Sequence, residues 1–330
     1  MSTVFGVARR LALTPSFADV SFAGLKFPVT ASAATRRLEA IPQAVICGFE
    51  WGIEVPGLDE LVQRLELVDP LQRGFAYEGA TMAYTVRDAM AAGRGGRTAR
   101  LLSGPGVPHT FLTYIGIGFA MARLPRPLWR NVLPDLTGTP YFPTMSWLAV
   151  DGYGFDRAYF DPTKYVTGQQ RPTTYPWQGR ADYFPRAVDQ GVGRALWFIH
   201  GGAPDAVGAA VRRFATTRHA DLWSGVGLAA TFAGGADAAG LTTLVRESGE
   251  LHSHLGQGSV FAAKARQFSG HVPPHSAEAV HVLTGLALPA AAALADDVSL
   301  SDQDGDGAPD YEIWRRQVRD RIPAGAMSAR

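Results

Sequence analysis

An acidic loop near the C-terminus, Asp302-Gln-Asp-Gly-Asp-Gly-Ala-Pro-Asp310, matches the Asp-x-Asp-x-Asp-Gly pattern of calcium-binding loops. Its four carboxylates would repel one another strongly unless a cation lay between them. The glutamate that completes an EF-hand is missing, because Ile313 stands at its position. We therefore predict a structural Ca²⁺ site whose ligands are Asp302, Asp304, Asp306, the Ala308 carbonyl and Asp310. The alternative is a solvated acidic turn that caps a helix over residues 309–322.

Carboxylates and a phenol beside glycines form a second set of chemical candidates. The segment Asp151-Gly-Tyr-Gly-Phe-Asp156 holds two carboxylates and a phenol around one glycine pair. Burial shifts the pKa of a carboxylate and can make it a general acid or base. A structural alternative has Asp151 capping a helix and Asp156 pairing with an arginine such as Arg157. The candidate catalytic residues are Asp156, Glu78, Asp151, Tyr153 and His254.

The histidines make a weaker case for a metal site. His252 and His254 lie just before Gly256, and on a helix rings two residues apart would point about 200° away from each other, which is poor geometry for one metal. Histidines that are hydrogen-bonded or on the surface are the simpler interpretation. His254 stays a cavity candidate because it lies two residues before a glycine pair. No Walker A loop, Rossmann fingerprint or Gly-x-Ser-x-Gly elbow occurs, so we expect no nucleotide cofactor.

A glycine pair recurs six times along the chain. The copies lie at residues 74 and 79 (the irregular first copy), 116–118, 152–154, 191–193, 225–227 and 256–258. Their second glycines are 39, 36, 39, 34 and 31 residues apart, a spacing typical of repeat architectures. Each glycine inside a helix costs about 1 kcal/mol relative to alanine, so something must compensate. Close packing of helices is the structural explanation, and approach of the backbone to a ligand in a shared cavity is the functional one.

Side chains beside these glycines are the candidates for contact with a substrate. Polar groups occupy similar positions in several apolar copies, and they would converge on one central space if the copies closed into a ring. The candidate substrate-binding residues are Trp223, Phe155, Arg194 and Gln257.

The sequence predicts that the segments carrying these residues are helices. Asp69-Pro70 has the cap residue and first-turn proline that begin a helix, which we expect to run to about Met90. Apolar stripes predict further helices over 58–67, 205–216, 222–232, 241–247, 256–268 and 276–288, with Asp221 as a possible cap. The expected fold is all-α, with helix pairs that could close into an α/α toroid. The expected segments are an arm (1–34), a helical-repeat domain (35–292) and a calcium loop with a helix (293–330).

Composition limits the partners. The chain of 330 residues has a net charge of +1 and only 18% charged residues, so no single-sign field exists to attract nucleic acid. Its single cysteine, Cys47, excludes an internal disulfide. No uninterrupted apolar run is long enough to span a bilayer, and no convincing signal peptide occurs. We expect a cytoplasmic protein that is not an integral membrane protein and that takes an apolar small-molecule substrate.

Five segments are distinctive in combination: residues 73–79, 148–155, 193–198, 221–230 and 256–262. Together they resemble a bacterial family of unknown function encoded in enediyne antibiotic gene clusters, over about residues 35–290. The resemblance implies a role in maturing the linear polyene made by an iterative polyketide synthase. It supplies no established catalytic residues.

Two classes of function fit these observations. In the first, the chain is an enzyme whose helical cavity holds a long apolar polyene, with carboxylates donating protons and aromatic rings stabilising cationic intermediates. Terpene-type cyclisation of a polyisoprenoid is the alternative chemistry, although no aspartate-rich signature supports it. In the second class, the chain is a non-catalytic scaffold that shields the polyene or docks other pathway proteins.

Overall fold

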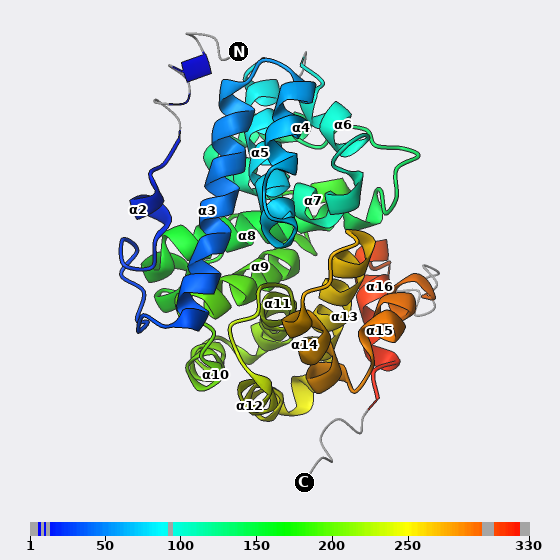
Figure 1. Cartoon of the computed structure of the whole chain (residues 1–330). Helices are drawn as coiled ribbons and strands as arrows, with labels where there is room; N and C mark the ends of the chain where they lie inside the picture. Colours follow the sequence, from blue (N-terminus) through cyan, green and yellow to red (C-terminus); the bar gives the residue numbers. More distant parts are fainter. Residues whose placement is uncertain (1–5, 8–9, 11–13, 92–94, 299–306, 324–330) are drawn as a thin grey trace. The chain divides into compact units, whose positions relative to one another are not determined.

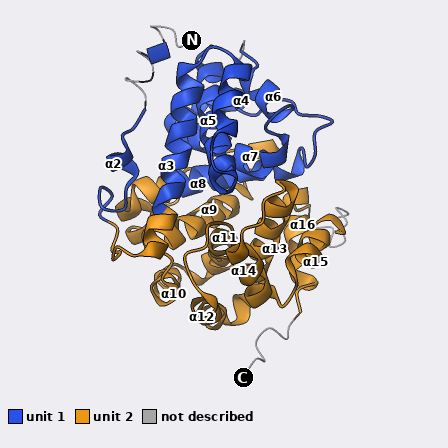
Figure 2. Ribbon diagram, in the orientation of Figure 1, with its two compact units in different colours: residues 1–26, 39–156 blue, residues 27–38, 157–330 orange. Residues whose placement is uncertain are grey.

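The computed structural model describes residues 6–7, 10, 14–91, 95–298 and 307–323. Helices and their connectors account for this part of the chain, and it contains no β-strand. The expectation of an all-α fold is therefore confirmed. The chain divides into two compact units, one of residues 1–26 and 39–156 and the other of residues 27–38 and 157–330 (Figure 2). This division differs from the three segments expected from the sequence, which stay predictions.

Unit 1 is built on long helices (Figure 1), and glycines lie at several of the contacts between them. Its elements are α2 (Phe17–Val20), most of α3 (Ala33–Glu54), α4 (Leu58–Glu66), α5 (Pro70–Met90), α6 (Arg97–Leu102), α7 (Thr110–Arg123) and the first part of α8 (Leu148–Phe160). Short helical turns η1 (Val107–His109), η2 (Arg126–Asn131) and η3 (Thr144–Trp147) lie in the connections. The helix predicted from Asp69-Pro70 is confirmed, because the Asp69 carboxylate accepts a hydrogen bond from the Leu71 backbone N–H at 2.8 Å.

Unit 2 has two rows of helices. The row of α9 (Phe184–Ile199), α11 (Thr216–Ala233) and α13 (His252–Phe268) carries the glycine pairs, and α11 packs against both of its neighbours. The second row is α10 (Pro204–Arg212), α12 (Ala238–Ser248) and α14 (Pro274–Thr284), in which α12 contacts the other two. The elements α15 (Leu288–Asp296) and α16 (Asp310–Asp320) pack against α13 (Figure 1). The turns η4 (Thr163–Thr167), η5 (Trp177–Gly179) and η6 (Gly249–Leu251) complete the unit.

Glycines allow the helices of each unit to touch backbone to backbone. A methyl group on Gly225 of α11 would lie 1.9 Å from the Gln190 carbonyl oxygen of α9, and one on Gly193 would lie 2.0 Å from the Leu222 carbonyl oxygen. In unit 1, a methyl group on Gly118 would lie 2.1 Å from the Ala149 carbonyl oxygen. Real side chains cannot approach a carbonyl oxygen so closely. The structural explanation for the glycine pairs therefore holds at these contacts.

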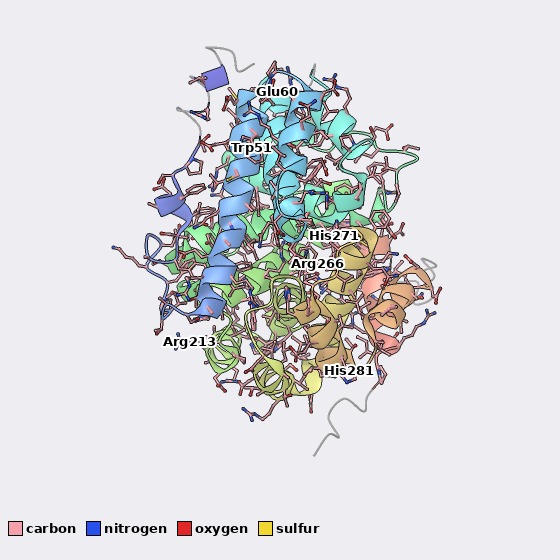
Figure 3. All side chains as sticks on the ribbon, in the orientation of Figure 1. Trp51, Glu60, Arg213, Arg266, His271 and His281 are labelled. Carbon is pink, nitrogen blue, oxygen red and sulfur yellow. The ribbon has the colours of Figure 1, made fainter. Side chains whose placement is uncertain are left out.

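The apolar side chains between the helices bury the rest of each core. Figure 3 shows side chains filling the spaces between neighbouring helices. Large rings are fully buried, including Tyr77 and Tyr114 in unit 1 and Trp197 in unit 2. The indole N–H of Trp197 donates to the Gly234 carbonyl at 2.8 Å, which satisfies its one polar atom.

Several helix boundaries differ from the sequence expectation, including the end of α10 at Arg212 and the start of α13 at His252. The helix predicted over 222–232 begins six residues earlier, at Thr216, so Asp221 lies inside α11 and is not its cap. The stretch predicted as one helix over 276–288 is divided into α14 and α15 at Gly285, whose φ of 72° ends α14. Glycine adopts this left-handed conformation without the steric cost of a Cβ.

Candidate functional site

The predicted site residues of unit 1 are buried but differ in their partners. Glu78, Asp151, Tyr153 and Asp156 are all at most 5% exposed. The Asp156 carboxylate pairs with Arg123 of α7, with an N–O distance of 2.9 Å. The partner is thus an arginine, as the structural alternative expected, but it comes from another helix. The Tyr153 ring packs edge-on against Trp129 at 4.9 Å, and Phe155 packs against Phe119 at 5.7 Å.

In unit 2, one predicted residue belongs to a buried polar network. The Gln257 side-chain oxygen on α13 accepts hydrogen bonds from Arg315 Nε at 3.1 Å and from Ser224 Oγ at 3.0 Å. Trp223 and Arg194 are buried on α11 and α9, and His254 is half-buried on α13. The network that Gln257 joins is the most extensive polar arrangement described in this unit.

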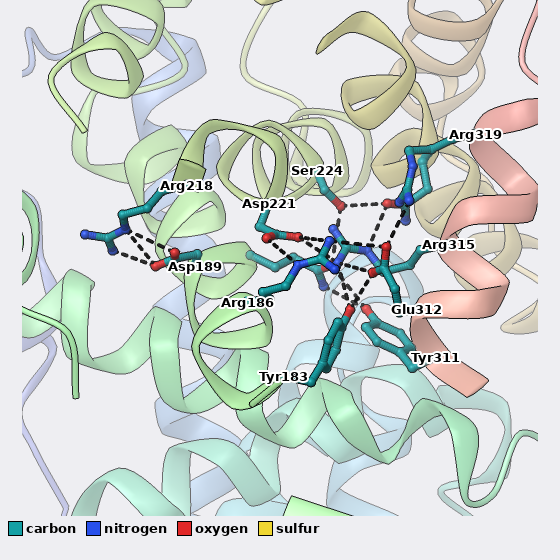
Figure 4. A network of polar contacts seen from close by, with 12 residues as sticks. Tyr183, Arg186, Asp189, Arg218, Asp221, Ser224, Tyr311, Glu312, Arg315 and Arg319 are labelled. Carbon is teal, nitrogen blue, oxygen red and sulfur yellow. Dashed lines mark hydrogen bonds and ion pairs between the residues drawn. The ribbon is translucent and has the colours of Figure 1, made fainter. Parts of the chain in front are cut away.

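Arg315 is the centre of this network (Figure 4). Its side chain is 0% exposed. Its Nη1 donates to Asp221 Oδ1 at 2.8 Å, to the Tyr183 hydroxyl at 2.8 Å and to Glu312 Oε2 at 3.0 Å. Helix α16 thereby joins α11 and the start of α9 through a single guanidinium group.

Two further arginines surround the same carboxylates. Arg186 donates to Asp221 from Nε at 3.0 Å and pairs with Glu312 Oε1 at 3.2 Å, while Arg319 Nη2 donates to Glu312 Oε1 at 2.9 Å. Burial by itself would raise the pKa of Glu312, but the three guanidinium charges outweigh it and hold that pKa well below its usual range. Burial raises the pKa of Tyr183 well above its ordinary value, so its hydroxyl stays neutral and donates to Glu312 at 2.7 Å.

Neutral side chains beside the glycine pairs complete the network. Gln190 and Ser224 each directly precede a pair, and Gln257 lies between the glycines of the last one. The Ser224 hydroxyl lies 3.3 Å from the Gln190 side-chain oxygen as well as 3.0 Å from that of Gln257. Gln190 also donates to the Tyr311 hydroxyl at 2.9 Å. Polar groups next to successive glycine pairs therefore meet at one place inside unit 2.

A second ion cluster lies beside the network. Arg218 of α11 is 5% exposed and donates to the Asp189 carboxylate of α9 from Nε and Nη2 (Figure 4). Arg171 contacts the same carboxylate at 2.8 Å. These groups satisfy one another, and they fix α9 to α11.

Three nitrogen atoms at the network are buried without a hydrogen-bond partner among the described residues. They are Arg315 Nη2, Arg319 Nη1 and His254 Nδ1. Burial lowers the pKa of His254 to about 4, and the nearby charges of Arg319 and Arg315 add to the effect. His254 is therefore neutral at pH 7.

Because of this histidine, the free energy of unfolding should decrease as the pH is lowered. The unfolded chain binds a proton as pH falls through 6.5, whereas the folded chain resists protonation down to about 4. Between pH 7 and pH 4, we expect wild type to lose up to about 3 kcal/mol more unfolding free energy than His254→Gln. Urea unfolding of both proteins at each pH measures this difference. Parallel losses in the two proteins would show that His254 is not shielded.

The sequence did not identify the charged members of the network. Attention to the glycine pairs led to Gln257, but Arg315 and Glu312 lie on a helix whose sequence is mostly polar. Gln190 and Ser224 carried a usable signal, since each is a polar residue immediately before a glycine pair.

The predicted calcium ligands are only partly within the described residues. Asp302, Asp304 and Asp306 lie outside them, while Ala308 is half-buried and Asp310 is the exposed first residue of α16. Elsewhere in the described ranges, no group of three or more His, Cys, Asp or Glu side chains is arranged to hold a metal ion.

Unit 1 contains a separate pocket of about 390 Å³ between α5, α6 and the segment after η2. Its wall includes Asp88, whose carboxylate accepts from the Thr98 backbone N–H at 2.9 Å and from Thr98 Oγ1 at 3.1 Å. None of the predicted site residues lines it.

Comparison with models of protein families identifies the family to which the chain belongs. Residues 4–322 match the profile of a family described as protein of unknown function, DUF1702. The chain belongs to this DUF1702 family. Comparisons of the DUF1702 chain with curated proteins and with solved structures find no significant match. No single helix in the described part of this DUF1702 protein is long and apolar enough to cross a membrane, although the bent pair α14 and α15 passes that test by length and composition.

Proposed function

We propose that this DUF1702 protein binds and converts a long apolar polyene in the maturation of an enediyne-type polyketide. The observation that carries the proposal is the meeting of Gln190, Ser224 and Gln257 around Arg315 inside an apolar helical unit. Buried polar groups that are held in place by one another are suited to orient a ligand whose remaining surface is apolar. The sequence resemblance supplies the pathway, and the low charge of the chain agrees with an apolar ligand.

The expected arrangement is a ring of helix pairs around a central space. Backbone contacts at the glycine pairs support close side-by-side packing within each unit. In this proposal Glu78, Asp151 and Asp156 of unit 1 supply protons, and Tyr153 of the same unit stabilises polarised intermediates. The burial of all four side chains agrees with a role away from bulk water.

Binding of a neutral conjugated polyene tests the proposal. Diphenylhexatriene fluoresces strongly in apolar surroundings, and we expect a saturable rise in its fluorescence when the protein is added. Squalene, a polyisoprenoid without conjugation, should compete weakly. Strong competition by squalene would favour terpene-type chemistry, and an absence of saturable binding would overturn the proposal.

Catalysis requires a separate measurement. The linear polyene released by an iterative polyketide synthase should lose its absorption band when it is incubated with the protein. Glu78→Gln and Asp156→Asn should each slow this loss by about 100-fold if the carboxylate donates a proton. Unchanged conversion in both variants would remove these residues from the mechanism. Binding without conversion by wild type would indicate the scaffold function.

Calcium is proposed as a structural ion in the loop at residues 302–310. Binding to the folded state alone should stabilise the protein by about 2–3 kcal/mol at saturating calcium. The melting temperature should therefore fall when a chelator is added, and the variant Asp304→Asn should no longer respond. An identical melting temperature with and without chelator would show that the loop holds no calcium.

A further inference from the structure

The unsatisfied nitrogens of unit 2 point to the kind of ligand that the network receives. Most buried polar groups in proteins have a hydrogen-bond partner, so each exception requires an explanation. Here three exceptions occur on neighbouring side chains, Arg315, Arg319 and His254. Arg315 and Arg319 both donate to Glu312, from Nη1 to Oε2 at 3.0 Å and from Nη2 to Oε1 at 2.9 Å. Both guanidinium groups therefore lie against the same carboxylate (Figure 4), and the charges of both lower the pKa of His254.

We propose that Arg315 Nη2, Arg319 Nη1 and His254 Nδ1 bind the carboxylate of a small organic acid. This inference rests on the proposed function, because it names the polar group of an otherwise apolar polyene ligand. The site is built from α13 and α16, two helices that pack against each other.

Charge in the network favours an anion. Arg186, Arg315 and Arg319 supply three positive charges, whereas Asp221 and Glu312 supply two negative charges. The three arginines therefore exceed the two carboxylates by one positive charge; Arg186 is 39% exposed, whereas Arg315 and Arg319 are 0% and 11% exposed. An unpaired buried charge is costly, and a ligand with a single negative charge removes that cost.

The chemistry of the donors favours a carboxylate over water. Guanidinium nitrogens can only donate, and a neutral imidazole can donate from Nδ1. A water molecule bound to these donors would need acceptors for its own hydrogens, whereas a carboxylate accepts several hydrogen bonds and donates none. Arginine N–H groups match the spacing of carboxylate oxygens and form short, charge-assisted bonds with them.

The surroundings of the site favour an apolar chain attached to the carboxylate. Tyr311 and Trp314 of α16 stack with ring centroids 6.4 Å apart, and Phe261 of α13 meets Trp314 edge-on at 5.6 Å. Leu255 and Val260 of α13 are fully buried. The two helices that carry the donors thus also carry buried apolar and aromatic side chains.

Parinaric acid, a conjugated tetraene fatty acid, and its methyl ester form a matched pair of fluorescent probes. Wild type should bind the acid at least about tenfold more tightly than the ester, because only the acid is charged. Arg319→Lys keeps the positive charge beside Glu312 but removes the unbonded Nη1. It should weaken binding of the acid about tenfold and leave binding of the ester unchanged. Arg246→Gln removes an exposed arginine of the same unit and should change neither.

The outcomes separate this inference from the proposed function. Equal binding of acid and ester by wild type, or an equal change for both probes in Arg319→Lys, would overturn the carboxylate site and leave polyene binding intact. Failure of both probes and of diphenylhexatriene would overturn polyene binding itself. Acetate and inorganic phosphate serve as competitors without a polyene chain. Displacement of the acid by phosphate at a lower concentration than by acetate would show a phosphate site and contradict the carboxylate assignment.

Discussion

Replacing Arg315 with methionine is expected to lower the free energy of unfolding by about 3–5 kcal/mol. The reason is that Asp221 and Glu312 lose a common partner while both stay buried, at 3% and 2% exposure. Tyr183 and Gln257 lose a donor in the same substitution. Arg186 and Arg319 still balance the two carboxylates in charge, but the buried oxygens that Arg315 contacted lose its hydrogen bonds and its ion pairs. Urea unfolding followed by circular dichroism measures the loss.

The matched control removes an arginine that the network does not use. Arg246 is 72% exposed, and its contact with Asp205 is 3.8 Å long. Arg246→Met should therefore change stability by less than about 1 kcal/mol. If Arg315→Met were as stable as the control, the network would not contribute to the free energy of unfolding.

The substitution Gly225→Ala is expected to destabilise the protein by roughly 2 kcal/mol or more. Alanine gains about 1 kcal/mol over glycine from helix propensity. The added methyl group would nevertheless lie 1.9 Å from the Gln190 carbonyl oxygen and 2.7 Å from the Arg194 backbone nitrogen. Both atoms belong to the backbone of α9 and cannot rotate away, so the helices must separate. Overpacking therefore outweighs propensity.

Gly240 provides the control for this prediction. It lies in α12, and the nearest atom to an added methyl group is the Ala236 side-chain carbon at 3.1 Å. Gly240→Ala should change stability by less than about 1 kcal/mol, because the gain in helix propensity offsets a small shift of Ala236. Melting curves of the two variants and wild type make the comparison. A Gly225→Ala protein as stable as Gly240→Ala would show that α9 and α11 do not pack as closely as described.

The glycine pairs could be recognised from the sequence, but their purpose could not be fully assigned. Their spacing predicted a repeated feature, and the cost of a glycine inside a helix suggested close packing, but the structure supplied which helices touch. The side chains that would meet were harder to choose. The assignment of Gln257 to substrate binding stays a prediction; in the structure its side-chain oxygen accepts hydrogen bonds from Ser224 and Arg315.

Local physics explains what the sequence determined by itself. Caps, first-turn prolines and apolar stripes act over a few residues, so α5 could be placed from Asp69-Pro70 and the all-α character could be predicted. Only the tertiary structure decided which polar side chains contact one another in the interior of unit 2. The hydrogen bond between Arg315 and Tyr183 spans 132 residues, and its partners lie on helices whose own patterns do not reveal it. A buried charge is tolerated only where opposite charges on other helices contact it. Such contacts depend on how the helices pack and not on the local sequence.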